Sequence, residues 1–465
     1  MGTITIIDGI YCKASRDLWP TISRLMEYEG ERWKMSPGGF GRQKEIKTRS
    51  FLDHRGGKFL CGFLPRVKNS IRSTGEDLKI NGIPFYLPPP NRPNIKPPEG
   101  ARLEQFALQT HIAEVAVKNQ RGIIQAPTGS GKTTIAMLIA SMFYPKHKIL
   151  FLCHTISLLT QTYQEFANRG FSDIGMVGGA FLKKFSDTLV KDNRIVISTV
   201  QTFSKFDPKE YCDQFDVVLI DEAHHCNAIT GQFGKILTHL LAPVKIGFTA
   251  TIPTAREASL ALEGIIGPII GEISIQEGVE LKIMAKPKIK LVPIPHNSLF
   301  GDIRKYNELY RAAIVDSRIR NSRIASVAVD LASSGLSSLI IVKEIQHGDN
   351  ITDMIRMKGH KCSFVQGNTS GEIRDAVKEQ LEQKGIKIVV CTAVWKEGVN
   401  IPSLNCVINA AGGKSEISTL QAIGRGLRSV PGKKEIVIYD FLDPYKYLAQ
   451  HAIQRIAIYV EAGWI

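Results

Sequence analysis

The segment QAPTGSGKTTIA, residues 125–136, carries residue types that bind phosphate. Glycines let successive backbone amides turn towards one anion, and a helix that starts directly after the turn points its positive end at the same anion. The spacing Ala126-x-x-x-x-Gly131-Lys132-Thr133 matches the phosphate-binding loop GxxxxGKS/T, with alanine in place of its first glycine. A plain glycine-rich turn is the alternative, but an apolar run precedes the loop and a helical pattern follows it, as the motif requires.

The loop predicts a nucleoside triphosphate site that uses Mg²⁺. Lys132 is predicted to reach the β- and γ-phosphates, and Thr133 to offer its hydroxyl to the metal. The nucleotide-binding residues predicted from the loop are Pro127, Thr128, Gly129, Ser130, Gly131, Lys132, Thr133 and Thr134.

A second motif, VVLIDEAHH at residues 217–225, places two acids after an apolar run. Acids at the carboxyl end of a strand face the crevice where ligands bind in open α/β sheets. Asp221 is predicted to hold Mg²⁺, and Glu222 to act as the base that orients the attacking water. His224 is predicted to sense the γ-phosphate, whereas His225 is interpreted as structural.

Two series of short apolar runs surround these motifs, with helical patterns between the runs. Continuous apolar runs predict strands that are buried on both faces of a parallel sheet, and the alternation predicts doubly wound α/β domains. The first series is 122–126, 148–153, 194–199, 216–221 and 245–250, and the second is 337–343, 362–367, 386–392, 405–412 and 435–441. Helices are predicted at 102–118, 157–168, 317–332, 371–384, 416–428 and 444–460.

Composition shifts predict where the domains of the 465-residue chain begin and end. The proline-rich stretch YLPPPNRPNIKPPEG reads as an extended connector, because proline fixes φ and disfavours helix before it. Residues 273–300 show no clear helix and are interpreted as a junction. The predicted organisation is an N-terminal module at 1–85, a linker at 86–100, a first α/β domain at 101–272, the junction at 273–300 and a second α/β domain at 301–465.

The net charge of +15 predicts a polyanionic partner. Residues 32–72 contain eleven Lys or Arg residues and only two acids, together with Trp33, Phe40, Phe51, Phe59 and Phe63. Aromatic residues among basic ones suit stacking on bases beside phosphate contacts, but they suit a small hydrophobic core equally well. The module at 1–85 is therefore predicted, from composition only, to be a basic α+β module that binds nucleic acid.

Several classes of protein do not fit the sequence. The eight cysteines form no C-x-x-C pair, which argues against a zinc or iron–sulfur cluster and favours a reducing compartment. No apolar run is long enough for a membrane helix, and the start MGTITIIDGIYCK has no features of a signal peptide. We expect a cytoplasmic protein without a membrane partner.

With both motifs in view, the sequence resembles the superfamily 2 helicases and translocases over residues 100–465. Further matches are STVQT at 198–202, FLCHT at 151–155, TAT at 249–251, VCTAVWKEGVNIP at 390–402 and QAIGRGLR at 421–428. The resemblance implies two tandem RecA-like doubly wound parallel-sheet domains. It implies nucleic-acid contacts from His154, Thr155, Thr199, Gln201 and Thr392, nucleotide contact from Gly398, and catalytic roles for Gln421 and the arginine fingers Arg425 and Arg428. Asn400 stands where the family often has Asp.

The resemblance also implies a glutamine that recognises adenine about twenty residues before the phosphate loop. Gln109 fits that spacing, and Gln105 is the alternative. An amide suits this role because it can donate to and accept from the edge of a base.

The compact layout, together with DSRIRNSRIASVA at 316–328, is similar to the UvsW-like and XPB-like helicases of phage recombination and repair. That group implies a monomeric motor driven by ATP and Mg²⁺, which moves on DNA and unwinds or branch-migrates forked, junction or duplex DNA. Three alternatives stay open. They are the motor subunit of a restriction–modification system, an RNA helicase, and a binding protein with an inactive ATPase.

Overall fold

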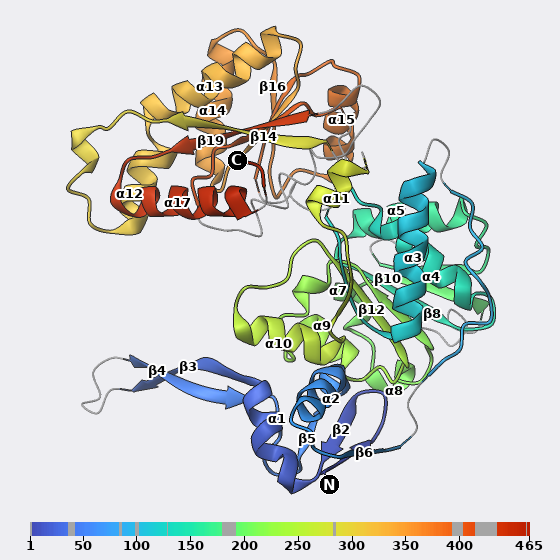
Figure 1. Ribbon diagram of the computed structural model, residues 1–465. Coiled ribbons are helices and arrows are strands. Elements are labelled where there is room, and N and C mark those ends of the chain that lie inside the picture. Colours follow the sequence, from blue (N-terminus) through green and yellow to red (C-terminus); the bar gives the residue numbers. More distant parts are fainter. Residues whose placement is uncertain are drawn as a thin grey trace. The chain divides into compact units, whose positions relative to one another are not determined.

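The computed structural model describes residues 2–35, 42–82, 86–97, 102–127, 129–178, 192–281, 285–392, 403–413, 435–461 and 463–465. The chain forms two compact units (Figure 1). The first comprises residues 1–126 and 131–272, and the second comprises 127–130 and 273–465. Among the described residues, no helix is both long enough and apolar enough to cross a membrane.

The N-terminal module is a small α+β fold built on a four-stranded sheet of order β5-β2-β1-β6. Its sheet and its two α-helices enclose a core that includes Ile4, Ile22 and Val67. Phe59 and Phe63 belong to that core and are almost fully buried, so the structure assigns these two aromatics to packing and not to base stacking. The elements are β1 (Gly2–Ile6), β2 (Tyr11–Ala14), α1 (Trp19–Leu25), β5 (Lys58–Leu60), α2 (Leu64–Ser73) and β6 (Leu78–Asn81).

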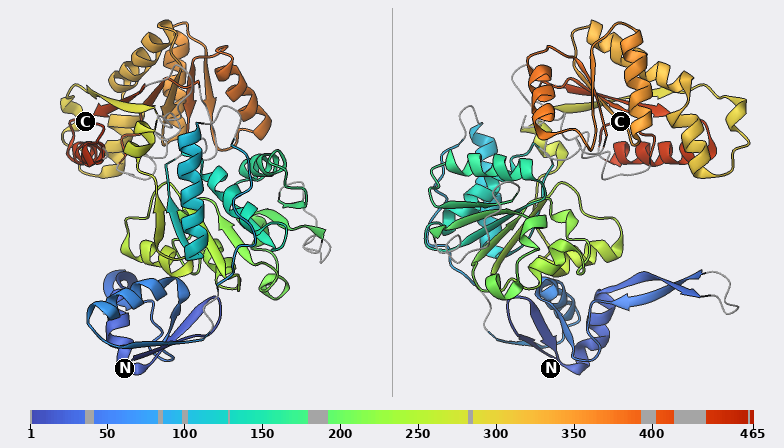
Figure 2. Two further views of the ribbon diagram at one scale, coloured as in Figure 1. Left: turned by 45° about the vertical axis from the view of Figure 1, so that its right-hand side comes forward. Right: turned by 180° about the vertical axis from the view of Figure 1, so that it is seen from behind.

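A separate two-stranded ribbon extends from the same module (Figure 2). It consists of β3 (Glu27–Met35) and β4 (Arg42–Ser50), which pair antiparallel over nine residue pairs from Glu27↔Ser50 to Met35↔Arg42.

The N-terminal module packs against the α/β domain of the first unit, and the two share one hydrophobic cluster. Gly62 permits the closest approach, because a Cβ at this position would lie 2.1 Å from the Glu263 carbonyl oxygen. The Arg66 guanidinium donates Nε and Nη2 to the two carboxylate oxygens of Glu263, at 2.7 and 2.5 Å. Arg121 donates Nη1 to the Gly9 carbonyl of the module, at 2.5 Å. The module is thus part of the same packed body as this domain.

The α/β domain of the first unit contains a seven-stranded parallel sheet of order β13-β7-β12-β11-β8-β10-β9. Helices cover both faces, with α3 and α4 on one side and α9 and α10 on the other (Figure 1). The strands are β7 (Arg121–Gln125), β8 (Ile149–Cys153), β9 (Ile174–Val177), β10 (Ile195–Thr199), β11 (Val217–Ile220), β12 (Val244–Thr249) and β13 (Ile269–Glu272). The helices include α3 (Leu103–Asn119), α4 (Lys132–Phe143), α5 (Ile156–Ala167), α7 (Val200–Phe203), α8 (Pro208–Tyr211), α9 (Gln232–Leu237) and α10 (Arg256–Ile265).

All five strands predicted for this domain are present, and β8, β10, β11 and β12 are buried along their whole length. The sequence pattern did not predict β9 and β13, the two edge strands. Each contains a glycine and is only partly buried, so neither gives the continuous apolar run that marks a central strand.

The second unit contains a six-stranded parallel sheet of order β14-β19-β18-β15-β17-β16. One face packs on α13 and α14, and the other on α15 and α17. The strands are β14 (Lys286–Pro293), β15 (Ser338–Ile341), β16 (Cys362–Val365), β17 (Ile388–Cys391), β18 (Cys406–Asn409) and β19 (Glu435–Leu442). The helices include α11 (Ile275–Glu280), α12 (Tyr306–Tyr310), α13 (Arg318–Ser333), α14 (Ile345–Met357), α15 (Gly371–Glu382) and α17 (Lys446–Glu461). The predicted fold class, two doubly wound parallel-sheet domains with an α+β module, is confirmed.

The interpretation of residues 273–300 as a junction without helix is wrong in one respect and incomplete in another. The short helix α11 lies there, and it begins with a capping box between Ser274 and Glu277. The segment also contains β14, an edge strand of the second sheet. Lysines alternate with apolar residues in β14, and prolines lie near both ends, which suits an edge strand and hides the buried-strand pattern.

A buried ion pair fixes the last helix to the second sheet. The Arg455 guanidinium donates Nε and Nη2 to the two Asp440 carboxylate oxygens, at 2.8 and 3.0 Å, and the Tyr459 hydroxyl donates to Oδ2 at 2.7 Å. Both charged side chains are nearly inaccessible to water. Removing one partner of such a pair leaves an uncompensated buried charge.

We predict that Arg455→Met lowers the free energy of unfolding of the second unit by about 3–5 kcal/mol. Hydrogen exchange of the β19 amides measures this effect locally. Arg311→Met is the control, because the Arg311 side chain is 74% exposed beside Asp316 and should change stability by less than about 0.5 kcal/mol. Unchanged protection of β19 in Arg455→Met would contradict the prediction.

Candidate active site

The phosphate loop follows β7 and ends at the first residue of α4. Gly129 and Gly131 have φ of 93° and 89°, a region that side chains disfavour, so glycine is required at both positions. Ala126 is not among the residues with positive φ, and its methyl group is buried. Alanine in place of the motif's first glycine therefore causes no backbone strain. The Lys132 ammonium donates to the Ala126 carbonyl at 3.1 Å, and the Ser130 hydroxyl to the Pro127 carbonyl at 2.7 Å.

Gln109, predicted from spacing, lies against this loop. It projects from α3 and is only 2% exposed. A Cβ at Gly131 would lie 2.0 Å from Gln109 Nε2, so the missing side chain of Gly131 leaves the space that the amide occupies. Gln105, the alternative, is only half-buried on the same helix. The structure thus brings Gln109 to the phosphate loop.

The acidic motif begins where β11 ends, next to the loop. Glu222 has φ 48° and ψ 49°, the left-handed region, which costs energy for a residue other than glycine. Its amide donates to Asp221 Oδ1 at 3.0 Å, so the turn aims both carboxylates from one short segment. His224 Nδ1 lies 3.4 Å from Glu222 Oε2 and 3.1 Å from Thr249 Oγ1.

The two carboxylates differ in their electrostatics. Burial and the charge of Glu222 raise the pKa of Asp221 to about 7, against the opposing charge of the Lys132 ammonium. Burial also acts to raise the pKa of Glu222, but its hydrogen bond with His224 and the charge of Lys132 outweigh this and lower that pKa to about 2. Glu222 is therefore ionised at neutral pH, whereas a nearby cation would stabilise the ionised form of Asp221.

These oxygen groups fit Mg²⁺ chemically. A carboxylate whose ionised form is disfavoured by burial, combined with a threonine hydroxyl at the start of α4, is the type of donor set that this cation takes with phosphate oxygens. Asp221 and Thr133 supply these two groups.

A stack of rings joins the acidic motif to the segment at 151–155. The His224 and His225 ring centroids are 4.2 Å apart, and the His225 and His154 centroids are 4.1 Å apart with an interplanar angle of 14°. Phe233 continues the stack at 6.0 Å from His225. Burial and the charges of His224 and His154 lower the pKa of His225 to about 4, so this ring is neutral at pH 7. The sequence pattern did not predict this stack, because no spacing rule joins residues so far apart in the chain.

The residues predicted to contact nucleic acid from the first unit lie at or just after the carboxyl ends of the adjacent strands β8 and β10. Thr155 and Thr199 cap α5 and α7, the helices that follow β8 and β10, and their hydroxyls accept from amides of those helices. Thr199 is only 3% exposed, whereas Gln201 is exposed on α7. Of these two, Gln201 has the side chain that reaches solvent.

Thr392, predicted for the second unit, is 7% exposed directly after β17, and its amide donates to the Val365 carbonyl at 3.1 Å. Thr134 lies on the first turn of α4. The other predicted site residues lie outside the described part of the chain. They are Thr128, Gly398, Gln421, Arg425 and Arg428.

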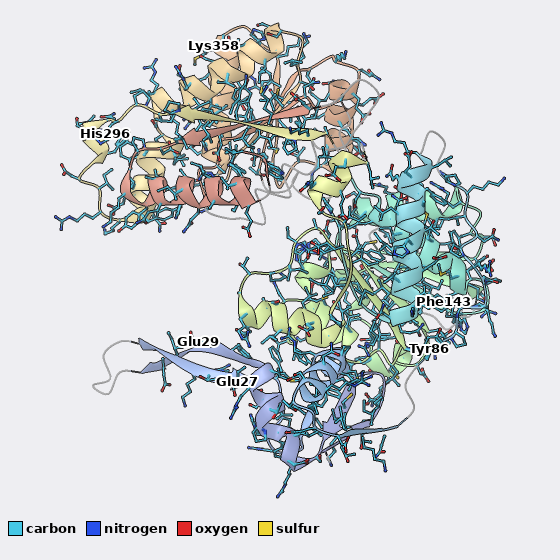
Figure 3. All side chains as sticks on the ribbon, viewed as in Figure 1. Glu27, Glu29, Tyr86, Phe143, His296 and Lys358 are labelled. Atoms are coloured by element: carbon cyan, nitrogen blue, oxygen red, sulfur yellow. The ribbon has the colours of Figure 1, made fainter. Side chains whose placement is uncertain are left out.

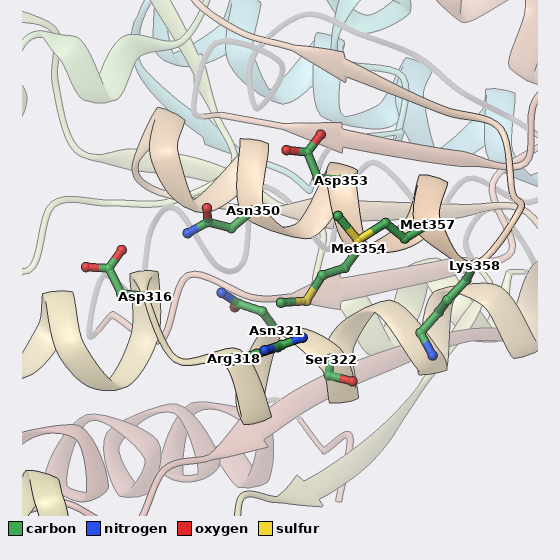
Figure 4. Close-up of a pocket in the computed structure, with 9 residues that line it drawn as sticks. All are labelled: Asp316, Arg318, Asn321, Ser322, Asn350, Asp353, Met354, Met357 and Lys358. Atoms are coloured by element: carbon green, nitrogen blue, oxygen red, sulfur yellow. The ribbon is translucent and has the colours of Figure 1, made fainter.

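A cavity of about 570 Å³ lies between α13 and α14 in the second unit (Figure 4). The amides of Asn321 and Asn350 both donate to the Val315 carbonyl, at 2.8 and 2.9 Å, so their donors already serve the fold. None of the residues that line this cavity is a predicted site residue. They are Asp316, Arg318, Asn321, Ser322, Asn350, Asp353, Met354, Met357 and Lys358.

Two family models match this chain. The model described as "Type III restriction enzyme, res subunit" covers residues 99–254, and "Helicase conserved C-terminal domain" covers residues 322–430. The "ATP-dependent DNA helicase uvsW" of Enterobacteria phage T4 is 28% identical over 390 residues, which are 77% of this chain and 76% of that protein. The "DNA 3'-5' translocase XPB2" of Sulfurisphaera tokodaii is 25% identical, over 76% of this chain and 82% of that protein. This chain belongs to the superfamily 2 helicases.

Other relatives are longer than the matched region. A putative helicase of a Sulfolobus islandicus filamentous virus is 27% identical over 75% of this chain and 65% of its own length. Among solved structures, Dbp5 of S. cerevisiae matches with a TM-score of 0.55 and 17% identity, over 76% of this chain and 88% of that one. A fragment of a putative HsdR subunit from Vibrio vulnificus matches with a TM-score of 0.56 and 17% identity, over 90% of this chain and 87% of that one. These structures share the fold of this superfamily 2 helicase.

We predict that His225→Ala weakens the stimulation of ATP hydrolysis by nucleic acid about tenfold, a coupling loss of ~1.4 kcal/mol, because the stack no longer joins His224 to His154. Hydrolysis without nucleic acid should stay within about twofold. Steady-state ATPase assays with and without nucleic acid measure both rates. His239→Ala, at an exposed position on the same unit, is the control. Equal losses in both rates would mean that His225 supports only the acidic motif.

Proposed function

We propose that this chain is an ATP-dependent DNA helicase that couples ATP hydrolysis to movement along DNA. It unwinds or branch-migrates forked, four-way or duplex DNA in recombination, repair or replication, as a monomeric motor. One observation carries the proposal. The phosphate loop, the amide of Gln109 and the acidic pair meet at the carboxyl edge of one parallel sheet. The names of the phage T4 and Sulfurisphaera relatives, a DNA helicase and a DNA translocase, support DNA as the track.

Each residue of the site has a role in this proposal. The loop amides and Lys132 hold the phosphates, while Gln109 recognises adenine from beside Gly131. Thr133 and Asp221 would hold Mg²⁺, which when bound neutralises charge on the β- and γ-phosphates. Glu222, which is ionised at neutral pH, orients the attacking water and accepts its proton. His224 senses the γ-phosphate. It can pass a change there to the TAT segment, because its Nδ1 lies within hydrogen-bonding distance of Thr249.

The remaining roles are assigned from sequence motifs. Arg425 and Arg428 act as arginine fingers on the γ-phosphate, Gln421 assists them, and Gly398 contacts the nucleotide. An arginine at the transferred phosphoryl group contributes about 10³–10⁵ in rate. Because these residues belong to the second domain, hydrolysis requires both domains, and cycles of hydrolysis then change the grip on DNA.

Two other functions remain as outcomes of the test. The restriction-enzyme family model and the likeness to the HsdR fragment favour the motor of a restriction–modification system. Such a motor requires a specificity partner, so ATP turnover with the purified chain and DNA alone argues against it. The likeness to Dbp5 rests on fold and favours RNA only weakly. Assays of ATPase and strand displacement on single-stranded, duplex, forked and four-way DNA, with RNA as a control, separate the three.

We predict that Lys132→Ala reduces DNA-stimulated ATP hydrolysis at least about 10³-fold, because the charge at the β- and γ-phosphates is lost. DNA affinity without nucleotide should change less than about twofold, since Lys132 is not among the residues predicted to contact nucleic acid. Fluorescence anisotropy measures affinity, and a coupled assay measures turnover. Lys146→Ala, on the loop after α4, is the control. Persistent turnover in Lys132→Ala would reject the proposed site.

We predict that Arg425→Ala lowers turnover by about 10³-fold while the nucleotide dissociation constant stays within about threefold, because the finger acts mainly on the transition state. Binding of a fluorescent ATP analogue gives the affinity. Arg311→Ala, at an exposed position in the same domain, is the control. Turnover at the wild-type rate would show that Arg425 is not a finger.

A further inference from the structure

The β3–β4 ribbon is a long element with no core of its own. Its nine residue pairs span roughly 30 Å at about 3.3 Å per residue, and it pairs with neither sheet edge of the module. Ile46 is 62% exposed on it, and Lys47, Thr48 and Arg49 are also exposed. Isolated two-stranded sheets are only marginally stable in water, so a ribbon of this length suggests that it binds a partner.

The pairing register separates charge between the two faces of the ribbon. Residues directly opposite each other share a face, and successive residues alternate between faces. Gly30 pairs with Lys47, and Tyr28 with Arg49, which defines one face. The residues that fall in this register are Tyr28, Gly30, Arg32, Lys34, Gln43, Glu45, Lys47 and Arg49. Four of these are basic and one is acidic, and we call this set the basic face.

The opposite register holds three of the four acids of the two strands, together with Lys44 and Arg42. Glu27, Glu29 and Glu31 all fall in it, paired with Ser50, Thr48 and Ile46. Figure 3 marks Glu27 and Glu29 on β3. The first register therefore holds four basic residues and one acid, whereas the opposite register holds two basic residues and three acids, so positive charge is concentrated on the basic face.

The root of the ribbon is fastened to α10 of the first unit. Arg256 Nε donates to the Glu27 carbonyl at 2.5 Å. Helix α10 contacts β3, and the Tyr28 hydroxyl bonds to Glu257 of α10 and to the Arg49 side chain. Burial and the charge of Glu257 raise the pKa of this hydroxyl. The Tyr28 ring packs on Phe51 at 4.9 Å, and Phe51 on Phe63 at 5.9 Å.

This attachment fixes the ribbon relative to the site. The helix α10 begins at Arg256, after a short loop that follows the TAT segment at 249–251, whose first threonine contacts His224. The same packing buries Phe59 and Phe63 and partly buries Phe51, so Phe59 and Phe63 offer no platform for unpaired bases. What the ribbon offers is charge along a straight line, which suits the phosphates of a duplex.

We propose that the β3–β4 ribbon is a duplex-binding arm whose basic face lies along the phosphates of double-stranded DNA. The inference rests on the proposed function, and it names the part of the track that this module holds. The major groove of B-DNA, about 12 Å wide, admits a two-stranded ribbon. Because α10 holds the root, the arm keeps the duplex in a fixed relation to the first motor domain.

The test compares Lys47→Gln/Arg49→Gln with Lys13→Gln/Lys79→Gln in the full chain. Both pairs remove two exposed charges from the same module, but Lys13 and Lys79 lie on its four-stranded sheet. Binding of mixed-sequence duplex and single-stranded DNA is measured by anisotropy over a series of salt concentrations. The ribbon variant should lose about tenfold or more in duplex affinity and reduce the slope of log affinity against log salt by about 1.8. Its affinity for single strands and the duplex affinity of the control should stay within about twofold.

A second variant guards against a fold defect, because Arg49 also bonds to Tyr28. Lys47→Glu keeps that bond and should still weaken duplex binding, whereas Lys79→Glu should not. An unchanged duplex affinity and salt slope, or equal losses on duplex and single strands, would overturn the arm. A different result would contradict the proposed function: ATP hydrolysis by the wild-type chain would not be stimulated by any of the DNA substrates.

Discussion

Thr249, fully buried at the end of β12, is the residue through which the parts of the site are held together. Its carbonyl accepts from the Ala126 amide at 2.8 Å, which fixes the start of the phosphate loop. Its hydroxyl lies 3.1 Å from His224 Nδ1 and donates to the Thr251 carbonyl at 2.8 Å. The strand β12 lies between β7 and β11. The phosphate loop, which follows β7, and the acidic motif, which follows β11, therefore begin on either side of Thr249. A displacement of β12 would therefore move the phosphate loop, the acidic motif and the TAT segment together.

Much of the fold follows from simple patterning, and the exceptions have a common cause. Central parallel strands are buried on both faces, so their apolar runs identified them at once. Edge strands such as β14, with its alternating lysines, lie half in water and lose that signature. For the site, the loop and acidic motifs are contiguous in sequence, and spacing also led to Gln109. The stack of His154 on His225 depends on how β8 and β11 lie side by side, which no local pattern encodes.

Composition alone left two uses open for the aromatic residues of the N-terminal module, base stacking and a small core. Basic and aromatic residues are mixed along residues 32–72, which is why stacking on bases was one interpretation. In the folded chain they separate, since Phe59 and Phe63 enter the core while Lys47 and Arg49 stay exposed on the ribbon. Three-dimensional sorting of this kind follows from the different costs of burying a ring and burying a charge.

The shared core between the N-terminal module and the first α/β domain has a practical consequence. Leu260, Ile265 and Ile266 pack in the same cluster as Phe63 and Val67. A fragment that begins at the proline-rich segment would expose these side chains to water, remove Arg66 from Glu263 and remove the Gly9 carbonyl from Arg121. A loss of activity in such a truncated motor would reflect insolubility and misfolding. Point variants at the surface are therefore the better way to determine what this module does.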